Sequence, residues 1–397
     1  MHRVHKIKLD PTQEQAIYFA RACGVARFAF NWALAAWKEE YEAGGKPNEA
    51  ALRKRLNSVK AEEFPWMSEV TKVAPQNAIK NVAVAFQHFF RRVKQGGKPG
   101  YPRFKRKGVH DSFRADNGPK DSRSNAVECV GPTIKLPRCG VVRMRESLRF
   151  DGRTLAATVS RMADGWYVAI LVDTSDCLSG SLDRGTVGVD LGIKELATLS
   201  TGEVVPALKP HRAEHARLTR LSRSLSRKQK GSSNRAKAKT KLAKLHLRIA
   251  RVRTDALHKL THKLATEFAT IAIEDLNVKG MMRNRHLARS IADAGFAEFR
   301  RQLEYKAAMT GACVHVVDRF FPSSKTCHSC GTIHPMKLSD RVMVCECGNV
   351  MDRDLNAALN LKNHAASSAV SACGEESSGS GRKTGTKLAS VKQEVEV

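Results

Sequence analysis

The sequence predicts an α+β protein built from several domains. Apolar residues recur every three or four positions from Pro11 to about Phe90, which is the spacing of helices packed on a core. Short alternating runs between Gly and Asp turns fill residues 110–178, and from residue 186 strands alternate with helices. With 397 residues, 42% of them hydrophobic, the chain can form two or three domains with a sizeable core.

The first ninety residues predict one strand followed by helices. Residues 1–10 contain the alternating run "RVHKIKL", as expected of a strand with one buried face. The helical pattern that follows includes four large aromatic side chains, which we interpret as core residues. These are Phe28, Phe30, Trp32 and Trp37.

A basic loop is predicted where "GGKPGYPRFKRKG" (96–108) interrupts the helical pattern. Arg103, Lys105 and Arg106 stand beside the aromatic residues Tyr101 and Phe104. Cations interleaved with aromatic rings are typical of a loop that contacts a nucleic-acid backbone. A solvated turn is the alternative interpretation.

Residues 110–178 predict a small β-barrel, which the strand at 1–10 would join. A linker is predicted at 175–185, where the chain reads "SDCLSGSLDRG". The remaining elements are a hairpin at 186–205, a buried strand within 268–281 that ends at Glu274 and Asp275, an amphipathic helix at 290–311, a strand at 312–318, a helix that begins at "DRDLNAALNLK", and a disordered Ser- and Gly-rich tail from about residue 365.

The chain is strongly basic. Lysine and arginine number 68 against 39 acidic residues, which gives a net charge of +29. Such a charge on a folded protein favours a polyanionic partner, and nucleic acid is the usual one. An anionic membrane surface is the rival, but no basic amphipathic helix with a Trp/Phe face is present.

This charge is concentrated in residues 209–253, which contain sixteen lysines and arginines and one acid, Glu214. An apolar stripe predicts two helices here, broken at "KGSSN". Since few acids balance the charge, a polyanion is expected along these helices, with Arg223, Arg227 and Lys228 as candidate contacts. The stripe consists of Leu218, Leu221, Leu225, Leu242, Leu245 and Ile249.

The sequence predicts no membrane partner. No run approaches the roughly 18 apolar residues that a membrane span needs. The opening "MHRVHKIKLDPTQEQ" lacks the apolar core of a signal peptide. We therefore expect a cytoplasmic protein.

Four of the ten cysteines form a metal-binding pattern. Cys327 and Cys330 make a C-x2-C pair, and Cys345 and Cys347 follow after fourteen residues as C-x-C. Four thiolates fit tetrahedral Zn²⁺ with no open position, which is a structural site of the zinc-ribbon kind. The other cysteines are expected to be buried or incidental thiols; they are Cys23, Cys129, Cys139, Cys177, Cys313 and Cys373.

Three acids follow apolar strands or open a helix: Asp190, Glu274, and either Asp352 or Asp354. A carboxylate in such a place is costly to bury unless something neutralises it. Mg²⁺ prefers carboxylate oxygens and keeps bound waters, and two such ions can promote in-line displacement at a phosphodiester. For any single acid a helix cap is the simpler interpretation, and Asp352 fits one well.

Several stretches resemble the TnpB (OrfB) family of bacterial insertion sequences, whose members are relatives of the type V CRISPR nucleases. They are "VGVDLGIKELATLSTG", "IAIEDLNVKGM", "ADAGFAEFRRQLEYKA", "FPSSKTCHSCG" and "CECGNVMDRDLNAALNL". The resemblance, which runs over most of the chain, implies a RuvC-type, RNase H-like nuclease domain. It makes Asp190, Glu274 and Asp354 the catalytic acids and leaves Asp352 as a capping or supporting residue.

The same resemblance implies RNA-guided cleavage. A guide (omega) RNA would pair with one strand of double-stranded target DNA, and the Mg²⁺ site would hydrolyse the DNA beside a short adjacent motif, leaving 5′-phosphate ends. The part that reads this motif falls near Lys72 and Gln76, whose side chains can hydrogen-bond to base edges. A monomer bound to its RNA is expected.

The resemblance also implies a division into domains, with the zinc ribbon inserted just before the last helix of the nuclease fold. There it would limit the movement of Asp354 relative to Asp190 and Glu274. The expected domains are a β-barrel (1–10 and 110–178), a helical recognition lobe (11–109), the RuvC domain (179–325 and 348–364), the zinc ribbon (326–347) and the tail (365–397).

Two other functions fit the same residues. A DDE-type transposase would use RNase H-like acids to join DNA strands. A zinc-ribbon regulator would bind DNA without catalysis and repress the element. Guide-dependent cleavage, strand transfer, or activity in cells that survives Asp190→Ala would distinguish the three.

Overall fold

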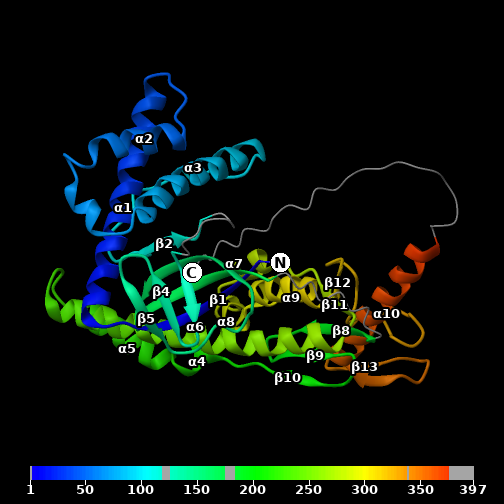
Figure 1. Ribbon diagram of the computed structural model, residues 1–397. Coiled ribbons are helices and arrows are strands. Elements are labelled where there is room, and N and C mark those ends of the chain that lie inside the picture. Colours follow the sequence, from blue (N-terminus) through cyan, green and yellow to red (C-terminus); the bar gives the residue numbers. More distant parts are fainter. Residues whose placement is uncertain (1, 119–125, 175–183, 338, 375–397) are drawn as a thin grey trace. The chain divides into compact units, whose positions relative to one another are not determined.

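The computed structural model describes residues 2–118, 126–174, 184–337 and 339–374 (Figure 1). The chain divides into two compact units, Met1–Cys177 and Leu178–Val397. None of the described helices combines the length and the apolar character needed to cross a membrane. Most of the predicted linker at 175–185 and the last part of the predicted tail, 375–397, lie outside the described residues.

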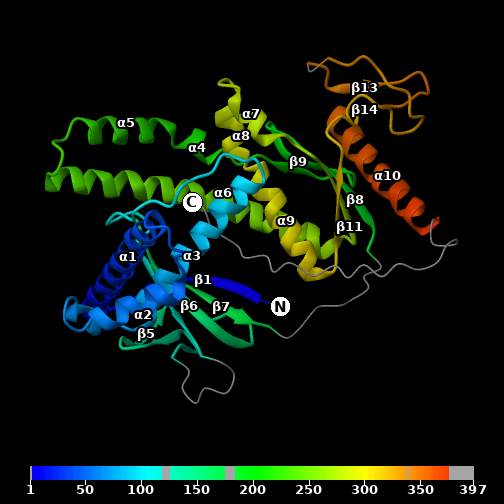
Figure 2. The same ribbon diagram turned by 90° about the horizontal axis from the view of Figure 1, so that it is seen from above.

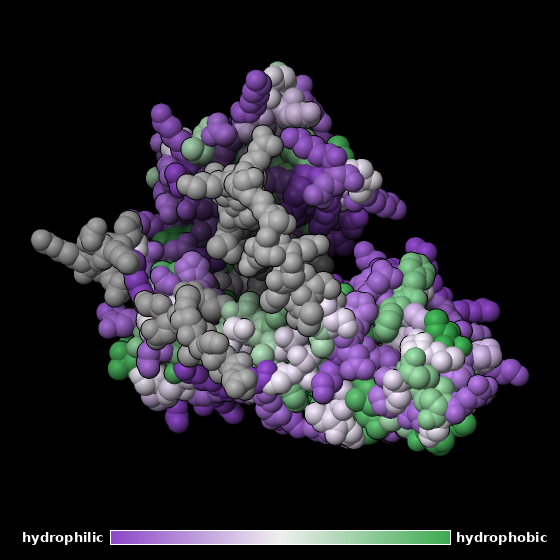
Figure 3. Space-filling view, turned by 90° about the vertical axis from the view of Figure 1, so that its right-hand side faces the viewer, coloured by the Kyte–Doolittle hydropathy of each residue, from purple (hydrophilic) through white to green (hydrophobic). Residues whose placement is uncertain are grey.

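The helices of the first unit lie where the apolar spacing predicts them. Thr12 begins the first helix with a reciprocal cap: its hydroxyl accepts from the Gln15 backbone N–H (3.3 Å), and the Gln15 side chain accepts from the Thr12 N–H (3.0 Å). The face that Figure 3 shows in its upper part is mainly hydrophilic. The helices are α1 (Gln13–Glu42), α2 (Glu49–Val59), the 3₁₀-helix η1 (Pro65–Glu69) and α3 (Val73–Lys94).

The strands of this unit form one antiparallel sheet in the order β2-β6-β7-β1-β5-β4-β3. The N-terminal strand β1 pairs with both β7 and β5, which confirms that residues 1–10 join the strands beyond residue 110. The strands are β1 (His2–Asp10), β2 (Ser112–Asp116), β3 (Glu128–Val130), β4 (Thr133–Leu136), β5 (Gly140–Met144), β6 (Arg153–Met162) and β7 (Gly165–Asp173).

The side chain of Asn117 links the ends of the two edge strands of this sheet. Asn117, which follows β2, accepts a hydrogen bond from the backbone N–H of Val127 and donates one to its carbonyl, both at 2.7 Å. Val127 directly precedes β3. The edge strands β2 and β3 are therefore linked at this end by side-chain hydrogen bonds. In the described residues they form no backbone pairing with each other.

Helices and sheet of the first unit share one core. The ring of Phe19 on α1 packs against Trp166 and Phe113 of the sheet, at centroid distances of 5.3 and 6.0 Å. The four predicted core aromatics belong to this core. Phe30 is buried in it, and the other three are partly buried and pack against it. Trp37, for example, stacks on Phe86 with ring centroids 4.7 Å apart.

The second unit has a mixed five-stranded sheet in the order β10-β9-β8-β11-β12. The first three strands form an antiparallel meander, and β11 and β12 run parallel to β8. The predicted hairpin at 186–205 and the two later strands are confirmed. The strands are β8 (Thr186–Leu191), β9 (Glu195–Leu199), β10 (Val204–Pro206), β11 (Thr270–Glu274) and β12 (Cys313–Val317).

Helices supply the crossovers that parallel strands require. The helix predicted at 290–311 is interrupted at Gly295, whose positive φ of 71° ends one helix and begins the next. The helices are α4 (Pro210–Ala213), α5 (His215–Ser226), α6 (Ser233–Glu267), α7 (Val278–Arg283), α8 (Ala288–Ala294), α9 (Phe296–Thr310) and α10 (Arg353–Gly374).

The two basic helices predicted in residues 209–253 are α5 and the first half of α6, which lie side by side as a hairpin (Figure 2). Leu218, Leu245 and Ile249 are buried between them, with Leu221 and Leu242 packed alongside. Five of the six residues of the predicted stripe thus form this small core, and Leu225 lies outside it.

The last helix, α10, follows a short hairpin of β13 (Val342–Val344) and β14 (Val350–Asp352). It continues to Gly374, so the prediction of disorder from residue 365 is wrong for its first ten residues. Ala365 is buried in a cluster with Leu361 of the same helix, Ala272 of β11 and Val317 of β12. Packing on the sheet extends this helix where composition alone indicated a tail.

Candidate active site

Asp190 and Glu274 leave the same edge of the second sheet. Val189 of β8 pairs with Ile273 of β11 in a parallel register, and each is followed directly by one of the two acids. The two carboxyl groups therefore stand at the carboxyl ends of neighbouring parallel strands, the place where open α/β sheets bind ligands.

Asp354 reaches this edge because α10 packs directly on β8. A β-carbon on Gly188 would lie 1.9 Å from the carbonyl oxygen of Ala358 and 2.7 Å from the backbone nitrogen of Lys362. The strand and the helix backbone are thus in contact at a position where only glycine fits. Ala358 lies one turn after Asp354, so this contact sets where the first turn of α10 meets Asp190.

Asp352 has a different place from Asp354. One of its carboxylate oxygens accepts hydrogen bonds from the backbone N–H groups of Asp354 (2.8 Å) and Leu355 (3.2 Å), which makes it the N-cap of α10. The charge of Asp354 raises the pKa of Asp190 more than the charge of Asp352 does. Its carboxylate also accepts from the Arg353 guanidinium at 3.1 Å.

The site carries surplus negative charge. Burial and, to a lesser extent, the charges of Asp354 and Glu274 together raise the pKa of Asp190 to about 7, while the charge of Arg353 opposes them. Burial also raises the pKa of Glu274, against the effect of a hydrogen bond from the Ser323 hydroxyl at 3.3 Å. Oxygen ligands that repel one another in this way fit a divalent cation such as Mg²⁺.

The neighbouring acid, Asp275, is already neutralised. Its carboxylate pairs with the guanidinium groups of Arg300 (2.6 Å) and Arg319, and these hydrogen bonds lower its pKa. Among the described residues no cation forms an ion pair with Glu274, so two adjacent acids at the end of one strand have different electrostatic environments.

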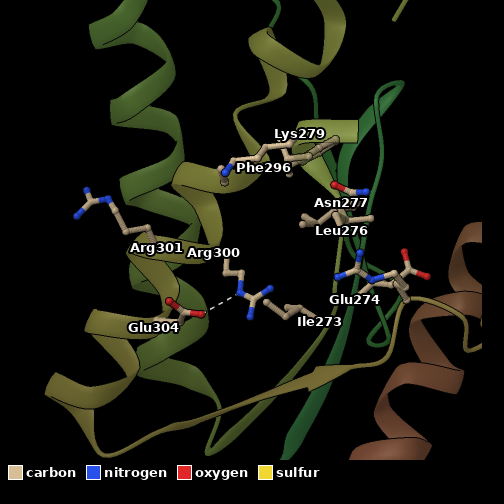
Figure 4. A pocket seen from close by; sticks show the side chains of 13 residues that line it. Ile273, Glu274, Leu276, Asn277, Lys279, Phe296, Arg300, Arg301 and Glu304 are labelled. Atoms are coloured by element: carbon tan, nitrogen blue, oxygen red, sulfur yellow. Dashed lines mark hydrogen bonds and ion pairs between the residues drawn. The ribbon is translucent and has the colours of Figure 1, made fainter. Parts of the chain in front are cut away.

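A pocket of about 350 Å³ opens beside Glu274 (Figure 4). Leu191 and Phe296 contribute apolar surface to it, and Lys279 and Arg300 contribute positive charge. Figure 4 shows Arg300 reaching toward Glu304, with which it forms an ion pair at 2.9 Å. Glu274 therefore borders a hollow with both apolar and cationic walls.

Two buried asparagines of α10 hold the loop that supports Glu274. The Asn360 amide donates to the carbonyls of Ser323 (2.7 Å) and Thr326 (2.6 Å), and the Asn356 amide donates to Thr326 as well (2.7 Å). Asn356 in turn accepts from the backbone N–H of His328. Our reading of the sequence missed this network, although two asparagines four residues apart on an apolar helix face were the available signal.

The four predicted cysteine ligands converge. Their sulfur atoms all lie within 4.8 Å of one another, with 3.6 Å between Cys327 and Cys347 and 3.4 Å between Cys330 and Cys345. These distances are too long for disulfides and suit four thiolates around an ion at about 2.3 Å from each. Gly331 and Gly348 take positive φ angles of 77° and 89° just after the two pairs.

Hydrogen bonds favour the thiolate form at Cys327. Burial opposes ionisation of this sulfur, but N–H groups of Cys330, Ser329 and Asn349 more than compensate and lower its pKa to about 6. The Asn349 amide lies 3.4 Å from the sulfur. Such bonds are the usual outer support of a metal-thiolate site.

Within the described residues, these cysteines are the cluster of three or more potential ligands with this close spacing, and the three carboxylates are not part of such a cluster. The sulfur atoms of the four cysteines are therefore spaced to share one metal ion.

The predicted nucleic-acid contacts lie in both units. On α5 and the turn after it, Arg223, Arg227 and Lys228 line one groove of about 770 Å³ together with Arg220. The structure thus brings these three predicted residues together on one strongly cationic face.

In the first unit, Lys72 is exposed at the start of α3, and Gln76 lies one turn later and is half-buried. Arg103 and Arg106 are exposed. Lys105 is exposed as well; its ammonium lies 4.4 Å from the centroid of the Phe30 ring, and desolvation lowers its pKa.

Comparison with known proteins identifies the family. The model of the IS605 OrfB family, described as "Probable transposase", matches residues 170–285, and a "Cas12f1-like, TNB domain" matches residues 296–361. A "Putative RNA-guided DNA endonuclease" of Streptomyces pristinaespiralis is 38% identical over 400 residues, which cover 99% of this chain and 96% of the relative. The chain belongs to the OrfB (TnpB) family.

Other members and structures agree with this assignment. The OrfB (TnpB) relative in Escherichia coli K12, "Putative RNA-guided DNA endonuclease InsQ", is 34% identical and covers 93% of both chains. The fold is also that of the protein in "Cryo-EM structure of the Cas12f1-sgRNA-target DNA complex", with a TM-score of 0.59 and 16% identity over 89% of this chain and 83% of that one. A helix-turn-helix model matches residues 1–46, which here form β1 and the single long helix α1.

Proposed function

We propose that this chain is a transposon-encoded, RNA-guided DNA endonuclease that hydrolyses target DNA beside a short adjacent motif. The convergence of Asp190, Glu274 and Asp354 at one edge of the sheet carries the proposal. Membership of the OrfB (TnpB) family, whose relatives are named RNA-guided DNA endonucleases, supplies the substrate and the guide. In this assignment the three acids are the catalytic residues and bind Mg²⁺.

The topology of the second unit supports a RuvC-type, RNase H-like domain. Three antiparallel strands are followed by two strands parallel to the first, and α10 packs on the sheet beside the acids. We assign the nuclease domain to residues 179–325 and 348–364, around a zinc ribbon at 326–347. In the first unit, we assign the helical recognition lobe to 11–109 and the barrel to 1–10 and 110–178.

The acids would act by charge and position. Mg²⁺, when bound, supplies an activated water and stabilises the charge of the leaving oxygen in an in-line displacement. Asp190 and Glu274 are presented by neighbouring strands, so their spacing changes little as the substrate enters. Ser323 holds one oxygen of Glu274, and Arg353 lies against Asp354 and offsets part of the negative charge.

The zinc ribbon would act on this site through structure alone. Four thiolates leave no open position for chemistry. Cys327 follows the loop held by Asn356 and Asn360, and β14 leads directly into the cap of α10. A bound Zn²⁺ would therefore stabilise both chain segments that border the catalytic acids.

Guide RNA and double-stranded target DNA are the proposed partners, and a monomer with its RNA is the proposed assembly. The groove of Arg223, Arg227 and Lys228 and the basic loop with Arg103 and Arg106 are proposed backbone contacts. Lys72 and Gln76 are proposed to contact bases of the adjacent motif.

The test uses purified protein with its co-purified RNA, Mg²⁺ and a target plasmid. We expect guide-dependent cleavage that falls at least about 100-fold in Asp190→Ala, Glu274→Gln and Asp354→Asn and is abolished by a chelator. Asp255→Asn, at an exposed acid of α6, should leave the rate unchanged.

Other outcomes would favour the other two functions. Joining of DNA strands without guide RNA would indicate a DDE-type transposase, as the description of the family model suggests. Activity in cells that survives Asp190→Ala, combined with DNA binding, would indicate a regulator and overturn the nuclease proposal.

A further inference from the structure

Phe320 is the most exposed large hydrophobic residue in the described part of the chain. Its exposed fraction is 85%, and the next value is 66% for Val130. The other phenylalanines of the second unit are buried or half-buried. Single exposed apolar residues are common on protein surfaces, so the surroundings of this ring decide whether it has a role.

The backbone around Phe320 is well anchored. Its N–H donates to the carboxylate of Asp318 at 2.8 Å, and the N–H of Phe321 donates to the Asp318 carbonyl at 3.0 Å. The Phe321 ring packs inward against His364 at a centroid distance of 5.0 Å. A short turn thus packs one phenylalanine, partly buried, against the core and presents the other to solvent.

This turn is attached to the catalytic edge on both sides. Arg319, just before Phe320, pairs with Asp275, the residue that follows Glu274. Ser323, three residues after Phe320, donates its hydroxyl to Glu274 itself. Arg319 also lines the pocket that opens beside Glu274. The turn that carries the exposed ring is therefore attached to one of the proposed metal ligands and to the residue that follows it.

We propose that Phe320 is a stacking platform for an unpaired base of the DNA strand that enters the acid site; this inference rests on the proposed function. A phenyl face accepts any base, because every base has a π surface. That tolerance suits a nuclease whose target sequence is set by its guide. The strand must be single-stranded at this point, since bases inside a duplex are already stacked and paired.

The ring would hold the nucleotide next to the scissile phosphate in line with the acids. A base–aromatic stack changes affinity roughly 5- to 150-fold when the ring is removed. Phe320 would thus be a positioning residue for the substrate strand rather than a participant in the chemistry. Recognition of the duplex target by the guide does not require it.

The test compares Phe320→Ala, Phe320→Leu and Phe320→Trp in the complete RNA complex with Mg²⁺. We expect single-turnover cleavage to slow about 5- to 100-fold in the Ala and Leu variants and to stay within about threefold in the Trp variant, which keeps a π face. Target binding, measured in an Asp190→Ala background, should be unchanged. Cleavage by Phe320→Ala at the normal rate, or full activity of Phe320→Leu, would overturn the proposal.

A scan of the substrate tests the same contact without altering the protein. One abasic position near the cleaved bond should slow the unmodified enzyme and have no added effect on Phe320→Ala. If no position behaves in this way, the stack does not exist.

The two proposals fail in different ways. Normal cleavage by Phe320→Ala beside an inactive Asp190→Ala overturns the stacking role alone. Cleavage by Asp190→Ala would overturn the acid site and the stacking proposal with it.

Discussion

Gly188 of β8 and Ala358 of α10 are in backbone contact: a β-carbon on the glycine would lie 1.9 Å from the alanine carbonyl oxygen. Gly188 lies two residues before Asp190, and Ala358 lies four after Asp354. This contact of strand and helix therefore lies two residues from one proposed catalytic acid and one helical turn from another, and it constrains the distance between them.

Gly188→Ala should separate α10 from β8 and impair cleavage. Neither backbone can yield locally, so the helix must shift by about an ångström or more, a misplacement that can cost about 100-fold in rate. Stability should fall as well, by about 1–3 kcal/mol for overpacking. Gly185→Ala is the matched control, because a β-carbon there would have no atom within 4 Å. Cleavage rate and thermal unfolding are the measurements, and equal behaviour of both variants would contradict the backbone contact.

Asp190→Asn should stabilise the metal-free protein at pH 8. The native pKa of about 7 is above the usual 3.9 of an unfolded aspartate. Between these two pH values Asp190 is therefore protonated in the folded protein and ionised in the unfolded chain. Stability therefore falls as pH rises from about 4 to 7, and the penalty is complete above that range. The asparagine of the variant carries no charge, so the variant does not lose stability in this way.

The measurement is thermal unfolding in a chelator at pH 5 and pH 8. We expect the midpoint of Asp190→Asn to exceed that of the native protein by at least about 2–4 °C at pH 8, the shift for about 1 kcal/mol in a unit of this size, and by little at pH 5. Mg²⁺ should raise the midpoint of the native protein more than that of the variant. A lower midpoint for the variant at pH 8 would contradict the buried, strained carboxylate.

Asn360→Leu should release the loop that supports Glu274. Removing the amide takes away the Asn360 hydrogen bond to the Ser323 carbonyl and one of the two side-chain amide donors to the Thr326 carbonyl, a loss of about 1–3 kcal/mol for buried groups. Guided cleavage should slow while guide-RNA binding persists. Asn363→Ala changes an exposed asparagine of the same helix and should be neutral in both assays. Unaltered cleavage in Asn360→Leu would show that the loop needs no such support.

Cys330→Ser should lower the zinc content and the unfolding temperature together, because metal binding and folding of such a small ribbon are coupled. Elemental analysis and thermal unfolding are the readouts. Cys313→Ser, at an exposed cysteine outside the cluster, should retain both. Full retention of zinc and stability in Cys330→Ser would refute the ribbon.

Combined Arg223→Ala and Arg227→Ala should weaken RNA binding and flatten its salt dependence. Each lost phosphate contact reduces the slope of log affinity against log salt by about 0.7–0.9. The control pair, Lys259→Ala and Lys263→Ala, removes the same charge from side chains already paired with Asp255 and Glu203. Binding measured across a salt series should separate the pairs, and equal slopes would remove α5 from the RNA site.

Sequence patterns predicted most elements because each depends on local spacing. The hairpin at 186–205, the basic helices and the cysteine pairs were all confirmed as elements or clusters. The errors arose where tertiary contacts overrode composition. Gly295 divides one expected helix in two, and packing against Ala272 and Val317 carries α10 into the expected tail.

By itself, the sequence determined which residue types were available: the acids that end buried strands, the thiols in metal-binding pairs, and a positive charge that calls for a polyanion. The family resemblance indicated different roles for Asp354 and Asp352 and selected Glu274, but the tertiary structure supplied the physical difference within each pair, Glu274 from Asp275 and Asp354 from Asp352. Two guanidinium groups from distant segments neutralise Asp275, and a helix end engages Asp352. Neighbours in sequence share their spacing and composition, so only the fold, by giving each a different electrostatic environment, separates their roles.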